Sequence, residues 1–240
     1  RKEDSPHDWT APNYGSRQQF ASHDDSPLVD SRDTKRIQEV LGTFLFYGRA
    51  VDLTMVTAIG SVATEQSCAT ELTMKAVTRL LNYAATHPDA KIRYHASGMK
   101  LYVESDASYL SESKARSRVA GFHYLSDDVP DPTKDQPPMN GAISITCKIL
   151  KAIMASAAET ELGGLFVNGQ DAVPERITRE ELGHPQGPTP MATDNGTASG
   201  IANDSIKQKR SKAMDMRFYW IRDRVRQGQF LIYWRKGSTN

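Results

Sequence analysis

Residues 99–106 have the sequence MKLYVESD, in which Met99, Leu101 and Val103 alternate with more polar neighbours. An alternation of period two is typical of a strand that buries one face and exposes the other. We expect this strand to end at Asp106. The segment therefore predicts the first strand of a sheet.

Strands and helices are mixed along the rest of the chain. The expected elements are strands at 119–125 and 142–147, a helix at 150–168, a strand at 191–193, helices at 197–203 and 212–226, and a strand at 230–234. The order is strand, strand, strand, helix, strand, helix, helix, strand. This order predicts an α/β domain over residues 96–240, in which helices flank a sheet.

Upstream of the first strand, the apolar residues recur with the spacing of an amphipathic helix. Apolar residues recur at i, i+3, i+4, i+7 and i+8 over 37–45, and a similar stripe covers 72–84 before a proline ends it. A further helix is expected at 53–63. Residues 34–95 are therefore predicted to form a small helical module.

The composition narrows the class of protein. A net charge of +1 over 240 residues favours no class of partner. Two cysteines are too few for a cysteine-based zinc cluster or a disulfide framework, so we expect an ordinary core in a reducing, intracellular compartment. No run approaches the roughly 18 uncharged apolar residues of a membrane-spanning helix, so membrane insertion is not expected.

The N-terminal segment is poor in core-forming residues. Residues 1–33 hold only seven apolar side chains, which are too few to offset chain entropy. We therefore expect a disordered or extended tail. The first residue is Arg1 rather than methionine, which indicates either a piece of a longer chain or an incompletely read sequence.

Three acidic residues are candidates for chemistry. Asp106 ends the first expected strand and Asp194 the fourth, and the carboxyl ends of adjacent parallel strands form a ligand-binding crevice. At about 100° per residue, Glu161 falls on the apolar face of its helix, whereas Glu159 points to solvent. A carboxylate aimed inward is unfavourable unless it is paired or bound to a metal. The three residues would supply the hard oxygen ligands that magnesium prefers.

Ordinary structural roles would explain the same residues. An aspartate at a strand end is commonly a turn former or a helix cap, and Asp194 could cap the helix that follows it. Glu161 could extend its carboxylate to the surface. The spacing alone leaves both interpretations open.

A basic segment lies near the end of the sequence. Residues 207–226 hold eight basic and two acidic side chains, a local excess of six positive charges. They could track a phosphate backbone, and Tyr219, Trp220, Tyr233 and Trp234 could stack on bases. The alternative interpretations are a solvated helix face for the charges and core positions for the aromatic rings.

Sequence blocks in both parts of the chain resemble the C-terminal part of a copia-type retrotransposon polyprotein, where the reverse transcriptase runs into its ribonuclease H domain. The similar blocks are 37–45, 49–52 and 80–83 in the helical module, and 105–108 (SDAS), 156–162 (SAAETEL), 193–195 (TDN) and 210–219 (RSKAMDMRFY) downstream. The last block is similar to the family's Arg-Thr-Lys-His-Ile-Asp-Ile-Arg-Tyr, with Ala213 in place of the histidine.

The resemblance implies a ribonuclease H-like fold, with a mixed five-stranded sheet whose first three strands are antiparallel, flanked by helices and preceded by a thumb-like or connecting module. It implies a metal-dependent endoribonuclease that hydrolyses the RNA strand of an RNA/DNA hybrid. Asp106, Glu161 and Asp194 would be catalytic and would hold two Mg²⁺ ions, with Mn²⁺ as a substitute. The nucleic-acid-binding residues would be Asn195, Lys209, Arg210, Lys212, Arg217 and Arg224.

The implied partners are the hybrid and the polymerase palm domain of the same polyprotein, in a cytoplasmic virus-like particle or in the nucleus. The family also places a fourth acidic residue on a helix after the last strand, and the sequence stops at Asn240 before reaching one, so we expect an incomplete site. An alternative function is that of a non-catalytic nucleic-acid-binding remnant of a decayed retroelement. A strand-transfer recombinase on the same fold is a third hypothesis, and the oligomeric state is not predicted.

Overall fold

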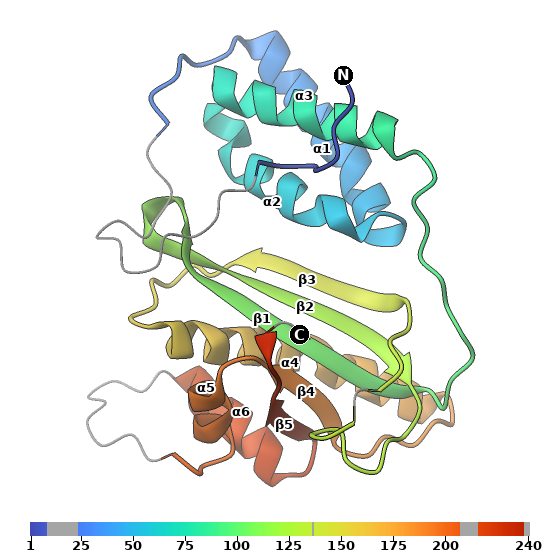
Figure 1. Ribbon diagram of the computed structural model, residues 1–240. Helices are drawn as coiled ribbons and strands as arrows, with labels where there is room; N and C mark the ends of the chain where they lie inside the picture. The colour runs from blue at the N-terminus through green and yellow to red at the C-terminus, as the bar shows by residue number, and fades with distance from the viewer. Residues whose placement is uncertain (9–23, 136, 207–215, 238–240) are drawn as a thin grey trace. The chain divides into compact units, whose positions relative to one another are not determined.

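The protein's structure, a computed structural model, describes residues 1–8, 24–135, 137–206 and 216–237 (Figure 1). The chain divides into two compact units, Arg1–Ile92 and Arg93–Asn240, and each has its own apolar core. Among the described residues, no helix combines the length and the apolar character needed to cross a membrane.

The first unit contains α1 (Ser31–Ala50), α2 (Val56–Glu65) and α3 (Glu71–Thr86), with the 3-10 turns η1 (Leu53–Met55) and η2 (Gln66–Cys68) on either side of α2. Thr70 caps α3 in a capping box with Thr73, which satisfies backbone N–H groups at the start of that helix. The apolar faces meet in a core that includes Ile37, Leu41, Met55, Ile59, Val77 and Leu80. The predicted helices are confirmed, but Leu45, which the pattern placed on the buried stripe, is 42% exposed.

The N-terminal segment is described in two stretches. Residues 1–8 and 24–30 contain neither a helix nor a strand of several residues, and Leu28 forms an isolated antiparallel bridge with Thr70 at the start of α3. Helix α1 begins at Ser31. The other residues of the predicted tail, 9–23, lie outside the described residues.

The second unit is an α/β domain. Its elements are β1 (Lys100–Glu112), η3 (Ser113–Ala115), β2 (Arg116–Ser126), β3 (Ala142–Ile149), α4 (Ala157–Glu181), β4 (Thr189–Thr193), α5 (Gly196–Ala202), α6 (Met216–Arg226) and β5 (Phe230–Trp234). The sheet order is β3-β2-β1-β4-β5 (Figure 1). Strands β1, β2 and β3 pair antiparallel, and β4 and β5 run parallel to β1. The prediction of a mixed five-stranded sheet, with the first three strands antiparallel and with flanking helices, is confirmed.

One apolar core joins the helices of this unit to the sheet. Its members include Leu101 and Val103 of β1, Leu162 and Leu165 of α4, Met191 of β4, Ile201 of α5, Phe218 and Ile221 of α6, and Phe230 and Ile232 of β5. Alternate residues of β1 supply Leu101 and Val103 to this core, but the strand does not expose its other face as the period-two pattern predicted, because Tyr102 between them is only 3% exposed. The packing therefore fixes α4 relative to the strand that carries Asp106.

The first strand is longer than predicted. β1 continues past Asp106 to Glu112, because its antiparallel pairing with β2 goes on beyond Asp106 as far as Ser108 before a shift in register. Its parallel pairing with β4 stops at Glu104. Asp106 therefore lies beyond the end of the β1–β4 pairing although it lies inside β1.

The long helix begins and ends later than predicted, at Ala157–Glu181 instead of 150–168. Ser156 supplies the N-cap, so the preceding residues belong to the loop after β3. The last turns escaped the prediction because a buried position there carries a polar side chain, Arg176, and because Pro174 lies inside the helix.

Candidate metal centre

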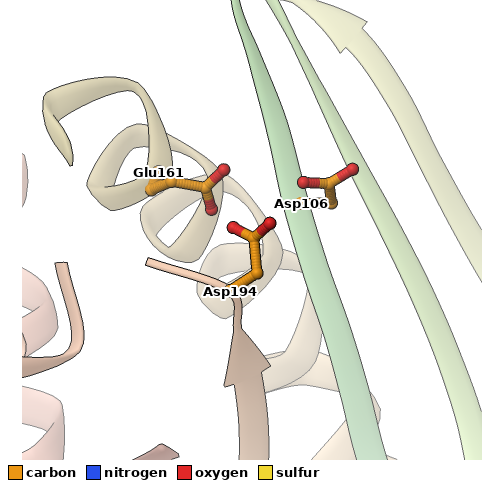
Figure 2. Close-up of side chains that lie close together, drawn as sticks. All are labelled: Asp106, Glu161 and Asp194. Atoms are coloured by element: carbon orange, nitrogen blue, oxygen red, sulfur yellow. The ribbon is translucent and has the colours of Figure 1, made fainter. Parts of the chain in front are cut away.

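Strand register places two of the predicted site residues side by side. Val103 pairs with Met191 and Glu104 with Ala192, so the same offset puts Asp106 level with Asp194, each two residues beyond the last pair. Figure 2 shows the two carboxylates at this edge of the β1–β4 junction. The expectation that they face each other is met by this register.

Helix α4 brings the third carboxylate to the same place. The Glu161 side chain is buried between β1 and β4, with 3% of the residue exposed. Its Oε1 accepts a hydrogen bond from the Ala107 backbone N–H at 3.0 Å, and its Oε2 accepts one from the Thr193 hydroxyl at 3.0 Å. Because these partners are the residue after Asp106 and the residue before Asp194, Glu161 is anchored to both neighbouring strands.

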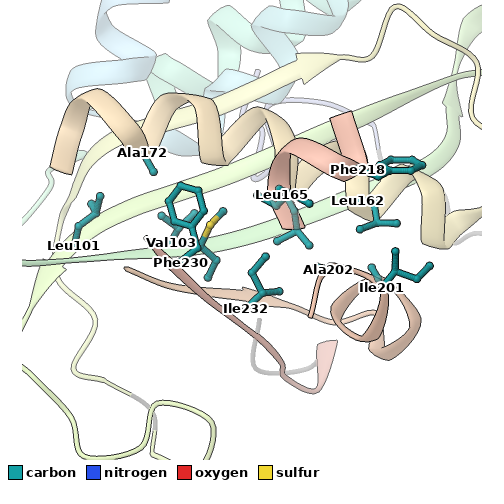
Figure 3. Close-up of a cluster of buried hydrophobic side chains, with 13 residues drawn as sticks. Leu101, Val103, Leu162, Leu165, Ala172, Ile201, Ala202, Phe218, Phe230 and Ile232 are labelled. Atoms are coloured by element: carbon teal, nitrogen blue, oxygen red, sulfur yellow. The ribbon is translucent and has the colours of Figure 1, made fainter. Parts of the chain in front are cut away.

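The local sequence of α4 explains this orientation. The neighbours Leu162 and Leu165 pack into the apolar core (Figure 3), so the helix face that carries them also presents Glu161 to the sheet. Gly164 permits the close approach, since a Cβ there would lie 3.3 Å from the Ser105 Oγ. Burial of Glu161 excludes the alternative that it extends to the surface. Glu159 is not simply solvated as predicted, because its Oε2 accepts a hydrogen bond from the Ala155 N–H at 2.7 Å.

The three carboxylates form one cluster. Asp106, Glu161 and Asp194 each offer an oxygen, and these atoms all lie within 4.8 Å of one another (Figure 2). Asp106 and Asp194 are exposed at the rim, and Glu161 is buried at the base. The predicted convergence is therefore present, while the catalytic and metal-binding roles stay predictions.

Burial and mutual repulsion both disfavour the ionised form of the carboxylates in this cluster. Burial, followed by the charges of Asp106 and Asp194, raises the pKa of Glu161 to about 8, although the Thr193 and Ala107 hydrogen bonds act in the opposite direction. Burial and the Asp194 carboxylate also raise the pKa of Asp106. Each shift means that the ionised form is disfavoured by the surroundings. A nearby cation would reverse this preference.

The donor set fits a hard divalent cation. All the candidate ligand atoms are carboxylate oxygens, which Mg²⁺ and Mn²⁺ prefer. Two oxygens at about 2.1 Å from one ion lie up to about 4.2 Å apart, so the 4.8 Å cluster needs only small side-chain movements to share ions. Asp106, Glu161 and Asp194 are therefore the residues that would hold the metal.

The structure describes three of the six predicted nucleic-acid-binding residues, at the start of α5 and on α6. Asn195 is the N-cap of α5, where its Oδ1 accepts a hydrogen bond from the Ala198 N–H at 3.0 Å. Asp194 is thus not the helix cap. Arg224 on α6 lies over the Trp220 ring at 5.1 Å, and Arg217 is half-buried on the same helix. Lys209, Arg210 and Lys212 lie outside the described residues.

The basic segment carries less free charge than its composition suggests. Arg226 forms an ion pair with Asp204 at 2.7 Å, and Arg222 pairs with the same carboxylate. Arg224 donates to the neutral Gln227 side chain at 3.2 Å, which leaves the charge of Arg224 in place. The role of this segment in nucleic-acid binding stays a prediction.

Sequence reasoning missed the residues that hold the carboxylates in place. Thr193 was noted only as part of the TDN block, yet its hydroxyl bonds Glu161. Trp234 was noted only as a ring that could stack on bases, yet its indole N–H donates to the Asp194 carbonyl oxygen at 2.8 Å and 54% of the residue is exposed. Thr193 directly precedes Asp194, and the β4–β5 pairing places Trp234 opposite Thr193. Strand register, which the sequence does not contain, was needed to find them.

No family model and no curated protein matches this chain. Among solved structures it is similar to RNase H1 from the halophilic archaeon Halobacterium salinarum, with 10% identity over 58% of this chain and 88% of that one (TM-score 0.36). It is similar to the N-terminal RNase H domain of a Mycobacterium tuberculosis protein, with 14% identity over 59% and 86% (TM-score 0.39). A foamy viral protease-reverse transcriptase in complex with an RNA/DNA hybrid matches over 87% of this chain and 27% of its own length, with 13% identity (TM-score 0.48). These identities are too low to transfer residue roles.

Proposed function

We propose that this chain is a metal-dependent endoribonuclease that hydrolyses the RNA strand of RNA/DNA hybrids, and that it is the ribonuclease H segment of a copia-type retrotransposon reverse transcriptase. The observation that carries this proposal is the meeting of three carboxylates from separate sequence blocks within 4.8 Å. The blocks are those in which the chain resembles the family. Asp106 and Asp194 come from the sheet with the strand order β3-β2-β1-β4-β5, and Glu161 comes from α4.

Each carboxylate has a distinct position in the proposed reaction. Asp106 and Asp194 are exposed and can reach ions that also contact a phosphodiester, whereas Glu161 is held at the base by Ala107 and Thr193. Bound Mg²⁺ or Mn²⁺ would supply an activated water and stabilise the leaving 3′ oxygen. With a pKa near 8, Glu161 holds a proton at neutral pH until a cation binds.

Charge distinguishes this proposal from a module that only binds nucleic acid. Three carboxylates gathered at one edge of a sheet repel a phosphate backbone unless divalent cations neutralise them. A pure binding surface gains nothing from such a cluster. The arrangement therefore favours a nuclease over the non-catalytic remnant.

Recognition of the hybrid is proposed to rest on α6 and on the basic residues before it. Arg217 and Arg224 would contact backbone phosphates, together with Lys209, Arg210 and Lys212. Contacts to the 2′-hydroxyl groups of the RNA strand would provide selectivity over DNA, because only RNA carries this group. Asn195, next to Asp194, is a candidate for one such contact.

The direct test is cleavage of an end-labelled RNA/DNA hybrid in Mg²⁺, compared with DNA and RNA duplexes of the same sequence. The wild type should cleave only the hybrid, and Asp106→Asn should lose at least about 100-fold in rate. Asp128→Asn is the matched control, since Asp128 is exposed and pairs with Lys100 at the other end of β1. It should keep full activity.

Two outcomes would contradict the proposal. If the hybrid is bound but cleaved neither by the wild type nor by a chain extended with a helix that supplies the fourth acidic residue, and Asp106→Asn binds equally well, the chain is a binding remnant. If duplex DNA is cleaved as fast as the hybrid, the recombinase hypothesis is correct instead.

A further inference from the structure

Helix α4 carries a buried polar stripe in addition to Glu161. Glu161, Asn168 and Glu175 are spaced seven residues apart, which returns to nearly the same face of a helix at 3.6 residues per turn. Glu161 and Asn168 are buried, and 17% of the Glu175 side chain is exposed. All three side chains bond to residues of the sheet. The stripe therefore needs an explanation beyond apolar packing.

Asn168 binds the two strands at the level of Asp106. This residue is completely buried, and its Nδ2 donates to the Ser105 Oγ and to the Ala120 carbonyl oxygen, both at 2.9 Å. Ser105 precedes Asp106, and Ala120 is the cross-strand partner of Asp106. One amide group thus links α4 to β1 and to β2 beside the carboxylate.

Gly121 on β2 leaves the space that the Asn168 side chain occupies. A Cβ on Gly121 would lie 1.9 Å from the Asn168 Oδ1, so no other residue fits at this place in β2 while Asn168 keeps its position. Glycine inside a strand weakens the strand and commonly marks a close approach of another group. Here the approaching group is the Asn168 amide. The glycine and the asparagine therefore depend on each other.

The far end of the stripe is also bonded. His123 on β2 is completely buried, and its Nδ1 lies 2.8 Å from the Glu175 Oε2. A buried polar group that loses its hydrogen-bond partner destabilises the folded state. These bonds therefore permit one rotation of α4 about its axis, whereas apolar contacts alone would tolerate several. A rotation by one residue would turn Glu161 about 100° away from the cluster.

From these contacts we infer that Asn168 is a positioning residue of the carboxylate site, which holds α4 at the rotation that brings the Glu161 carboxylate to Asp106 and Asp194. The inference rests on the proposed function in one respect, because it takes these carboxylates to be metal ligands. Asn168 itself does not contact the metal. It acts through the placement of Glu161, about 10.5 Å away along the helix axis.

The test separates packing from positioning through a pair of substitutions. Asn168→Ala leaves a space beside Gly121, and Gly121→Ala in the wild type collides with Asn168. In the double variant the methyl group introduced at position 121 occupies the space that the amide has left. The double variant should therefore recover at least half of the loss in melting temperature shown by the less stable single variant, but it lacks the polar link.

The second readout is Mn²⁺ affinity, measured by isothermal titration calorimetry on the full chain. We expect the double variant to bind Mn²⁺ at least about tenfold more weakly than the wild type. Arg176→Met is the matched control, because Arg176 is a buried polar residue of α4 that bonds Gly187 and Thr189 away from the cluster. It should lower the melting temperature and leave Mn²⁺ affinity within about twofold.

If the double variant folds poorly, Ser105→Ala provides the same test from the strand side, with an expected loss of threefold or more in Mn²⁺ affinity. The positioning role would be overturned if the double variant bound Mn²⁺ as tightly as the wild type. If the double variant folds poorly, the same result in Ser105→Ala would overturn it. Either result would leave the proposed function intact. No Mn²⁺ binding by the wild type would overturn the proposed function and this role with it.

Discussion

Replacing Glu161 by glutamine should make the metal-free protein more stable at alkaline pH. The side chain keeps its shape and both of its hydrogen bonds, because a glutamine oxygen can accept from the Ala107 N–H and its amide can donate to the Thr193 hydroxyl, which also accepts. The substitution removes the negative charge of the Glu161 carboxylate, which burial and the charges of Asp106 and Asp194 disfavour.

The magnitude follows from the raised pKa. The pKa of Glu161 is raised from 4.5 to about 8 in the folded state. Between these values the unfolded chain has released the proton and the folded chain has kept it, so the free energy of unfolding falls as pH rises. The slope is about 1.4 kcal/mol per pH unit, which gives an upper limit of about 5 kcal/mol above pH 8.

The assay is denaturant unfolding in EDTA at pH 5, 7 and 8.5, followed by tryptophan fluorescence, since Trp220 and Trp234 both lie in the second unit. The advantage of Glu161→Gln over the wild type should be below about 1 kcal/mol at pH 5 and several kcal/mol at pH 8.5. Mn²⁺ should stabilise the wild type more than the variant. A difference that does not change with pH, or a wild type that is the more stable at pH 8.5 in EDTA, would refute the reasoning.

Three further substitutions test the surroundings of the site. Thr193→Val removes a hydrogen bond that lowers the pKa of Glu161, so the alkaline loss of stability should become larger in EDTA titrations. Arg235→Met breaks the 2.7 Å pair with Glu104, whose side chain is 11% exposed, and urea unfolding at pH 7 should show a loss of about 3–5 kcal/mol that shrinks as the pH falls, because burial raises the pKa of Glu104 and protonation removes its unpaired charge. Leu165→Ala opens the core under α4 and should lower stability by about 2–5 kcal/mol, with Mn²⁺ affinity in calorimetry changed less than by Glu161→Gln.

Secondary structure and side-chain orientation could be predicted where the apolar periodicity of a segment fits a single type of element. The alternation over 99–106 predicted the central strand, and the helical wheel distinguished Glu161 from Glu159, because apolar burial orients both elements. Asp106 and Asp194 could be placed on neighbouring parallel strands, although Asp106 lies inside β1 and not at its end. These inferences need only local periodicity and the rule that adjacent parallel strands share an edge.

The rest required contacts that local patterns do not contain. β1 extends past Asp106 because β2 continues to pair with it, and the extending residues do not alternate in polarity. The second half of α4 was missed because Glu175 and Arg176 look like surface residues, although both bond to the sheet. Gly121 became interpretable only when its distance from Asn168 was known.

The most direct test of the metal centre is anomalous X-ray scattering from crystals grown with Mn²⁺. Our account predicts an anomalous peak between Asp106, Glu161 and Asp194, with an oxygen of each carboxylate about 2.1–2.3 Å from an ion. Strong peaks elsewhere in the crystal with none at these three residues would contradict it.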